Sequence, residues 1–135
     1  MIDSFIAFLK DKGIQYDVID NTVIKFSSDG LNFLFQYRKD DDPQFVRLML
    51  PRVEDVNGVE SDVFKRMIDV SSSIKAVKSI VVNGEVWLTC EEFLSSTEKI
   101  NQVFERMMAV LRLAYNHYAS AAAKNQTSSS SSSDE

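Results

Sequence analysis

The chain has 135 residues with 15 basic and 20 acidic side chains, so its formal net charge is −5. This length fits one domain that buries a sizeable core, and a lone cysteine, Cys90, excludes an intramolecular disulfide framework. An apolar content of 44% is too high for a disordered chain, and a pI near 4.9 argues against duplex DNA or an anionic membrane as the partner. No apolar run reaches the roughly 18 residues of a membrane span and no signal-peptide pattern opens the chain, so we expect a cytoplasmic protein.

The first half of the chain predicts a helix followed by an antiparallel meander. Apolar residues at helical spacing, ended by Gly13, predict the helix: Ile2, Phe5, Ile6 and Leu9. Period-two alternation over residues 14–18, 24–26 and 31–37, interrupted by turn compositions, predicts three strands. A fourth strand carries Val46, Leu48 and Leu50, and Pro51 should weaken its pairing.

The second half predicts a helix, a hairpin and a long final helix. The second helix begins near Ser61 and has Val63, Phe64, Met67 and Ile68 on one side. Asn83-Gly84 between residues 77–82 and 86–90 is a strong signal for a two-residue hairpin turn. The S-x-x-E spacing of residues 95–98 predicts a capping box, and one apolar stripe follows it: Ile100, Val103, Phe104, Met107, Leu111, Ala114 and Tyr118.

The predicted order is therefore α-ββββ-α-ββ-α, an α+β domain over residues 1–118. We expect a mainly antiparallel, twisted sheet with helices, chiefly the first and third, on one side. Residues 119–135 are rich in alanine and serine and lack large apolar side chains. Such a segment cannot bury enough surface to offset its chain entropy, so we expect a flexible extension.

Counting outward from the Asn83-Gly84 turn assigns side chains to the two faces of the sheet. Val77, Ser79 and Val81 should share the core face with the partners that they meet across the hairpin. The opposite face would then carry Ile80 across from Trp87, and the strands before it add Leu34 and Met49. Two interpretations stay open for these four residues: a partner-binding surface, or a face covered by a helix or loop of the chain itself.

The sequence offers no catalytic, cofactor or metal site. Cys90 and His117 lack a third group at catalytic spacing, and one Cys with one His cannot complete a zinc site. The acidic run at residues 40–42 lacks the glycine and the alternating ligands of a calcium loop. The basic residues are spread over several elements rather than gathered in an RNA-binding stripe. We therefore expect neither an enzyme nor a nucleic-acid-binding protein.

The element order and the hairpin sequence VVNGEVWLTCEEF, residues 81–93, followed by a long helix, resemble the YbjN-like family of bacterial sensory transduction regulators. That family shares its fold with type III secretion chaperones. The resemblance implies a small α+β domain that forms homodimers and binds other polypeptides, and it brings no catalytic residues with it.

We therefore expect a non-enzymatic interaction module, chaperone-like or regulatory, that binds another protein through an apolar surface of its sheet or of its second helix. The residues expected to make this contact are Leu34, Met49, Ile80 and Trp87. The alternative is a small-ligand sensor with a pocket between the sheet and the last helix. That pocket would lie near Phe104, Met108 and Tyr115.

Overall fold

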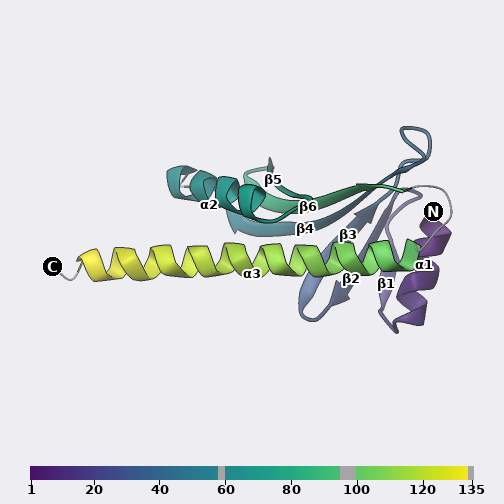
Figure 1. Ribbon diagram of the computed structural model, residues 1–135, viewed down its shortest axis with the longest axis horizontal. Coiled ribbons are helices and arrows are strands. Elements are labelled where there is room, and N and C mark those ends of the chain that lie inside the picture. The colour runs from purple at the N-terminus through teal and green to yellow at the C-terminus, as the bar shows by residue number, and fades with distance from the viewer. Residues whose placement is uncertain (58–59, 95–99, 134–135) are drawn as a thin grey trace.

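The computed structural model describes residues 1–57, 60–94 and 100–133, with side chains through residue 123. The elements in these ranges follow the expected α-ββββ-α-ββ-α order, which confirms the predicted α+β class (Figure 1). They are α1 (Ile2–Asp11), β1 (Tyr16–Val18), β2 (Val23–Ser28), β3 (Leu31–Gln36), β4 (Phe45–Asp55), α2 (Glu60–Ser73), β5 (Val77–Val82), β6 (Glu85–Phe93) and α3 (Ile100–Ser133).

The six strands described form one antiparallel sheet in the order β1-β2-β3-β4-β6-β5. The long pairing of β4 with β6 joins the N-terminal meander to the C-terminal hairpin. A register shift between Leu50 and Glu54 places a bulge directly after Leu50, where Pro51 removes a backbone donor from the ladder. β4 nevertheless continues to Asp55 beyond this bulge.

The β5–β6 hairpin has the predicted register. Asn83 and Gly84 both have positive φ, 51° and 77°, as a type I′ turn requires. Val82 therefore pairs with Glu85, and Ile80 pairs with Trp87. The assignment of alternate side chains to opposite faces follows directly from this register.

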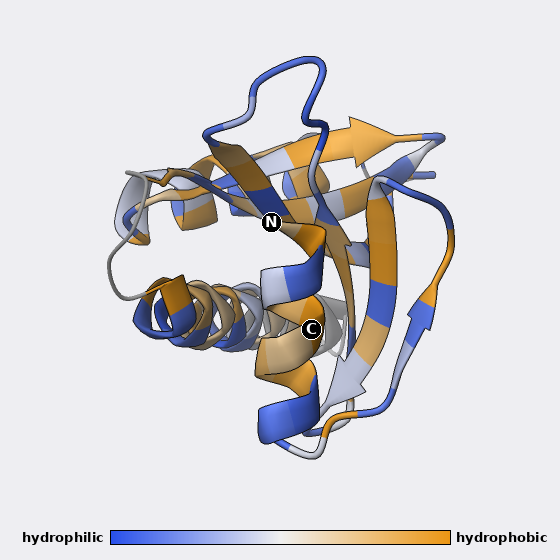
Figure 2. Ribbon diagram, turned by 90° about the vertical axis from the view of Figure 1, so that its right-hand side faces the viewer, coloured by the Kyte–Doolittle hydropathy of each residue, from blue (hydrophilic) through white to orange (hydrophobic). Residues whose placement is uncertain are grey.

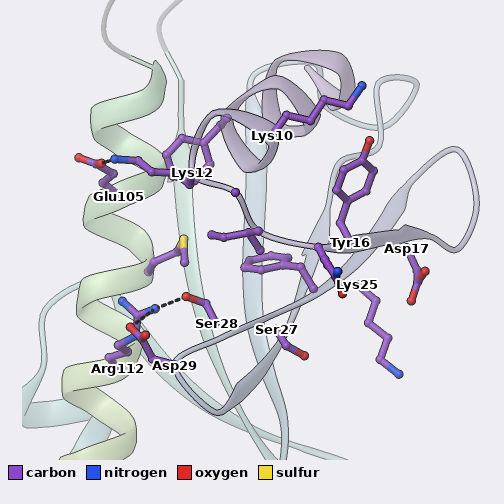
Figure 3. Close-up of a pocket in the computed structure, with 16 residues that line it drawn as sticks. Lys10, Lys12, Tyr16, Asp17, Lys25, Ser27, Ser28, Asp29, Glu105 and Arg112 are labelled. Carbon is purple, nitrogen blue, oxygen red and sulfur yellow. Dashed lines mark hydrogen bonds and ion pairs between the residues drawn. The ribbon is translucent and has the colours of Figure 1, made fainter.

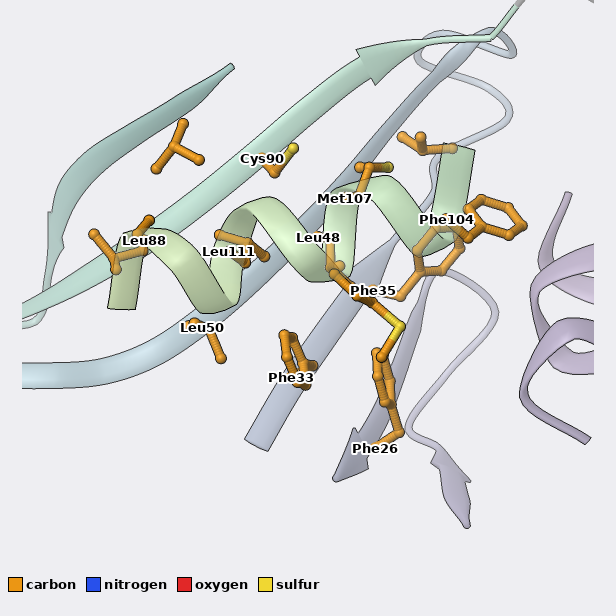
Figure 4. Packing of buried hydrophobic residues seen from close by; sticks show 14 of the residues in the cluster. Phe26, Phe33, Phe35, Leu48, Leu50, Leu88, Cys90, Phe104, Met107 and Leu111 are labelled. Atoms are coloured by element: carbon orange, nitrogen blue, oxygen red, sulfur yellow. The ribbon is translucent and has the colours of Figure 1, made fainter. Parts of the chain in front are cut away.

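The core lies on the inner face of the sheet, which we define as the face carrying Phe33, Phe35, Leu48 and Leu88. The sheet curves around α1 and α3, which pack on this face (Figure 2). The ring of Phe5 from α1 stacks on Phe35 with centroids 3.9 Å apart. Phe104, Met107 and Leu111 of α3 complete the cluster (Figure 4). Each buried phenylalanine contributes about 2 kcal/mol of transfer free energy, so aromatic packing of helix on sheet dominates the core.

The buried side of α2 differs from the prediction. Val63, Arg66 and Val70 are buried, whereas Phe64 and Ile68 are 44% and 67% exposed. The physical reason is an ion pair between Arg66 and Glu54, which follows the β4 bulge, because this pair turns the Arg66 side of the helix inward. The spacing of apolar residues along the helix could not predict that an arginine is buried.

Polar contacts also fix α2 over β5. The backbone N–H of Ser79 donates to Ser71 Oγ at 3.1 Å, and Ser79 Oγ donates to the Met67 carbonyl oxygen at 2.9 Å. Ser79 pairs with the buried Leu88 and therefore belongs to the inner face. The three described helices thus all pack on the inner side of the sheet.

The backbone of α3 is helical from Ile100 to Ser133 and extends well past the sheet (Figure 1). The domain boundary expected after Tyr118 stays a prediction, and the capping box at residues 95–98 lies outside the described residues. None of the described helices carries an apolar stretch long enough to cross a lipid bilayer.

Candidate functional site

The outer face of the sheet, opposite the core, carries all four residues expected to bind a partner. Leu34 of β3 lies directly across from Met49 of β4, and Ile80 of β5 lies across from Trp87 of β6. Thr89, the register partner of Met49, separates these two pairs. Met49 and Thr89 are only 6% and 0% exposed, so the centre of the face contributes almost no accessible surface. The accessible apolar groups are therefore Leu34, Ile80 and Trp87, which are half-buried.

A charged row crosses the outer face beside these apolar pairs. Arg47 Nε donates to Glu91 Oε1 at 3.1 Å, and an Nη of Arg47 donates to Gln36 Oε1 at 3.3 Å. On the other side, Lys78 Nζ lies 2.8 Å from the same Glu91 oxygen. Side chains from four adjacent strands thus form one hydrogen-bonded row. These partners come together through long-range strand pairing, so no local sequence pattern predicts the row.

The same face carries an aromatic pair that the sequence patterns did not predict. Phe45 of β4 is the register partner of Phe93 of β6, and their ring centroids are 5.3 Å apart. Phe93 is 71% exposed, the highest value among the large apolar side chains described. A signal was present, because Phe93 has the same parity as Trp87 along β6 and must project from the same face.

Trp87 lies beside the β4 bulge. The neighbouring residues of β6 pair with Leu50 and Glu54, so Trp87 faces the unpaired residues 51–53 of β4. Its indole Nε1 is buried and has no hydrogen-bond partner among the described residues. The side chain is thus held partly by its own molecule and still contributes apolar surface to the outer face.

A groove of about 1290 Å³ opens on the other side of the molecule, between the end of α1, the β1–β2 ribbon and α3 (Figure 3). Met108, one of the three residues expected near a ligand pocket, lines it. The other two expectations are not met, because Phe104 is buried in the core and Tyr115 packs against that core rather than lining the groove. The pocket therefore lies nearer to α1 and β1 than the sequence predicted.

Cys90 lies in the core, and His117 forms a contact between two helices. Burial, together with the nearby carboxylates of Glu92 and Glu91, raises the pKa of the Cys90 thiol to about 12, so the reactive thiolate is scarce near neutral pH. His117 Nε2 lies 2.7 Å from Asp69 Oδ2 and connects α3 to α2. Within the described ranges, no group of three or more His, Cys, Asp or Glu is placed to hold a metal ion.

A buried polar cluster joins α2, β4 and α3. The Arg66 guanidinium pairs with Glu54 and lies over the ring of Tyr118 at 5.9 Å. Burial, together with the nearby Glu54, raises the pKa of Tyr118 to about 12. The hydrogen bond to Glu54 likewise raises the pKa of Arg66, so the guanidinium keeps its charge in the folded protein. This cluster anchors α2 and is closed to substrate.

Comparison with known proteins supports the fold rather than a family. No protein-family model matches the chain, and no curated protein matches it either. Among solved structures, a chain of the heterodimeric ExoU–SpcU complex from the type III secretion system of Pseudomonas aeruginosa is similar, with a TM-score of 0.64. The match covers 90% of this chain and 97% of that one at 15% identity.

This chain shares the fold of that chain of the type III secretion complex. This confirms the predicted fold class, whereas the resemblance to the YbjN-like family finds no support from a sequence match. At such low identity the similarity shows shared architecture alone, and function has to be argued from the surfaces described above.

Proposed function

We propose that this protein is a non-enzymatic interaction module, chaperone-like or regulatory, that binds another polypeptide through the outer face of its sheet. The observation that carries this proposal is a sheet face that no described helix covers and that nevertheless carries Leu34, Ile80, Trp87 and the exposed Phe93. Apolar and aromatic groups of this size are the usual energetic centres of protein interfaces.

The solved neighbour supports the proposal by analogy. It comes from a heterodimeric complex, in which a chain of this architecture is bound to another polypeptide. The YbjN-like assignment remains part of our proposal and rests on the hairpin sequence and the element order.

Self-association is a separate expectation from that resemblance. The exposed pair Phe64 and Ile68, one turn apart on α2, is the apolar surface that a homodimer could use. Light scattering of the purified protein and of the Ile68→Asp variant tests this directly. If the wild type is monomeric, the expectation of a homodimer is wrong, whereas the proposal that the protein binds a different polypeptide is unaffected.

The test of partner binding uses site-specific photo-crosslinking. A crosslinking residue at Leu34 on the outer face should capture the partner, while the same residue at Gln102 on the exposed side of α3 should not. The captured protein is then purified and its affinity is measured for wild type and variants. We expect Trp87→Ala to weaken binding by about 2 kcal/mol or more, as is typical of an interfacial aromatic.

Leu34→Ala and Leu113→Ala form a matched pair for the same measurement. Leu34 lies on the outer face, whereas Leu113 is an exposed leucine of α3. Binding should fall for the first and stay unchanged for the second. Equal affinities for the two variants would show that the outer face is not the binding surface.

A further inference from the structure

The groove beside β1 has an apolar floor and a charged wall. Glu105, Met108 and Arg112 follow one another at i, i+3 and i+7 on α3, so they share the helix face that borders the groove. The floor is formed by Met108, Phe8 and Phe26, which are largely buried, and by the half-buried Ile14 and Tyr16, which supply more of the accessible apolar surface. A ligand in this groove would therefore meet apolar surface in its middle and charge at both ends.

Two polar bridges mark these ends (Figure 3). Lys12 at the end of α1 pairs with Glu105, and Arg112 pairs with the turn between β2 and β3. In the second bridge, an Nη of Arg112 donates to Ser28 Oγ at 2.6 Å and lies 3.1 Å from Asp29 Oδ2. These contacts hold α3 against both walls and keep the groove open between them.

The hydrogen bonds of Arg112 are incomplete. Its Nε is buried and has no partner among the described residues. A buried charged donor without an acceptor is unfavourable, so an added oxygen at this point would be favoured. The Asp29 side chain, which lies against an Nη of Arg112 and not against Nε, is 77% exposed.

The charge of the groove departs from that of the chain. The lining contains four cations and three carboxylates, whereas the whole chain carries −5. Lys10 and Lys25 form no ion pair with any described residue, and Asp17, which lies across from Lys25 in the β1–β2 register, offsets one of these two charges, so one positive charge is left at the rim. This balance favours an anion over a cation as the occupant.

We propose that the groove binds a small amphipathic carboxylate, with its apolar body against Phe8, Phe26 and Met108 and its carboxylate at Arg112. The argument rests on charge complementarity, the unpartnered Nε and the apolar floor. This site is separate from the outer face, so it goes beyond the proposed function and stands or falls independently of it.

Phenylbutyrate is the probe, and phenylbutanamide is its neutral counterpart with the same apolar body. Acetate and inorganic phosphate test the anionic head alone. Titration of the isotopically labelled protein by NMR should show phenylbutyrate shifting the signals of Ile14, Phe26 and Met108. Calorimetry should give an affinity about tenfold higher for the acid than for the amide. Equal affinity for acid and amide would overturn the proposal, as would shifts confined to the outer face or no shift at about 5 mM ligand.

Arg112→Gln should lower the affinity for phenylbutyrate about tenfold, and Arg106→Gln, an exposed arginine of the same helix, should leave it unchanged. Because Arg112→Gln also removes a bridge to the β2–β3 turn, Lys10→Gln serves as a second variant at an exposed position. It should weaken binding about threefold while preserving the melting temperature. Unchanged affinity in both variants contradicts the proposed site.

Discussion

Trp87 of β6 and Ile80 of β5 lie directly opposite each other on the outer face of the sheet, away from the three described helices. Two large apolar side chains on a face that no described helix covers have two explanations. Either a partner protein covers them, or they remain partly exposed to solvent in the monomer. We propose the first explanation, because the same face also carries Phe93, which is 71% exposed.

A matched pair of phenylalanine substitutions distinguishes the two faces. Phe33→Ala on the inner face should lower the free energy of unfolding by about 3–5 kcal/mol, because it opens a cavity beside the stacked ring of Phe26. Phe93→Ala on the outer face should change it by no more than about 0.5 kcal/mol. Chemical denaturation measures both values. A large loss for Phe93→Ala would mean that this ring belongs to the core.

The Arg66–Glu54 pair should contribute far more to the free energy of unfolding than a surface ion pair does. Arg66→Ala leaves the Glu54 carboxylate half-buried without its partner, and we expect a loss of about 3 kcal/mol of stability. The control is Arg52→Ala, because Arg52 is exposed and lies 3.8 Å from Glu85, so a loss of about 0.5 kcal/mol or less is expected. Similar losses in the two variants would show that the buried pair does not anchor α2.

The pKa of Tyr118 predicts a loss of stability at alkaline pH. An unfolded tyrosine ionises near pH 10, whereas the folded pKa is about 12, so only the unfolded state releases this proton between those values. The free energy of unfolding should therefore be unaffected below pH 10 and should fall as pH rises toward 12. Tyr118→Phe should reduce this dependence, as measured by denaturation at a series of pH values. An identical pH profile in the variant would contradict the assignment.

The Cys90 thiol should be protected in the folded protein. With its pKa raised to about 12 by burial, it should not react with a disulfide reagent at neutral pH until the chain unfolds. The rate of reaction, followed in buffer and in denaturant, checks this prediction. Rapid reaction of the native protein would show that the strand opens readily around residue 90.

Local patterns accounted for much of the fold. The Asn83-Gly84 turn sets the register of β5 and β6, because only one pairing satisfies a two-residue turn with both φ values positive. The inward Phe33 and Phe35 likewise follow from simple alternation along β3. Such short-range rules determine which face a side chain occupies, and so they placed Leu34, Met49, Ile80 and Trp87 on one face.

Long-range contacts were not predictable in the same way. The row of Arg47, Glu91 and Lys78 depends on β6 inserting between β4 and β5, which no local pattern specifies. The orientation of α2 was wrong for a related reason, since the burial of Arg66 depends on Glu54 beyond the β4 bulge. The groove forms where α1, β1, β2 and α3 meet. The residue pattern of α3 alone could not predict this meeting point, and Met108 is the only one of the three expected residues that lines the groove.

The most direct test of the central claim is the footprint of the purified partner on the protein, measured residue by residue by NMR or hydrogen exchange. The account predicts protection on the outer face, around Leu34, Ile80, Trp87 and Phe93, with the groove residues unchanged. Protection confined to α2 or to the groove, with the outer face as accessible as in the free protein, would contradict it.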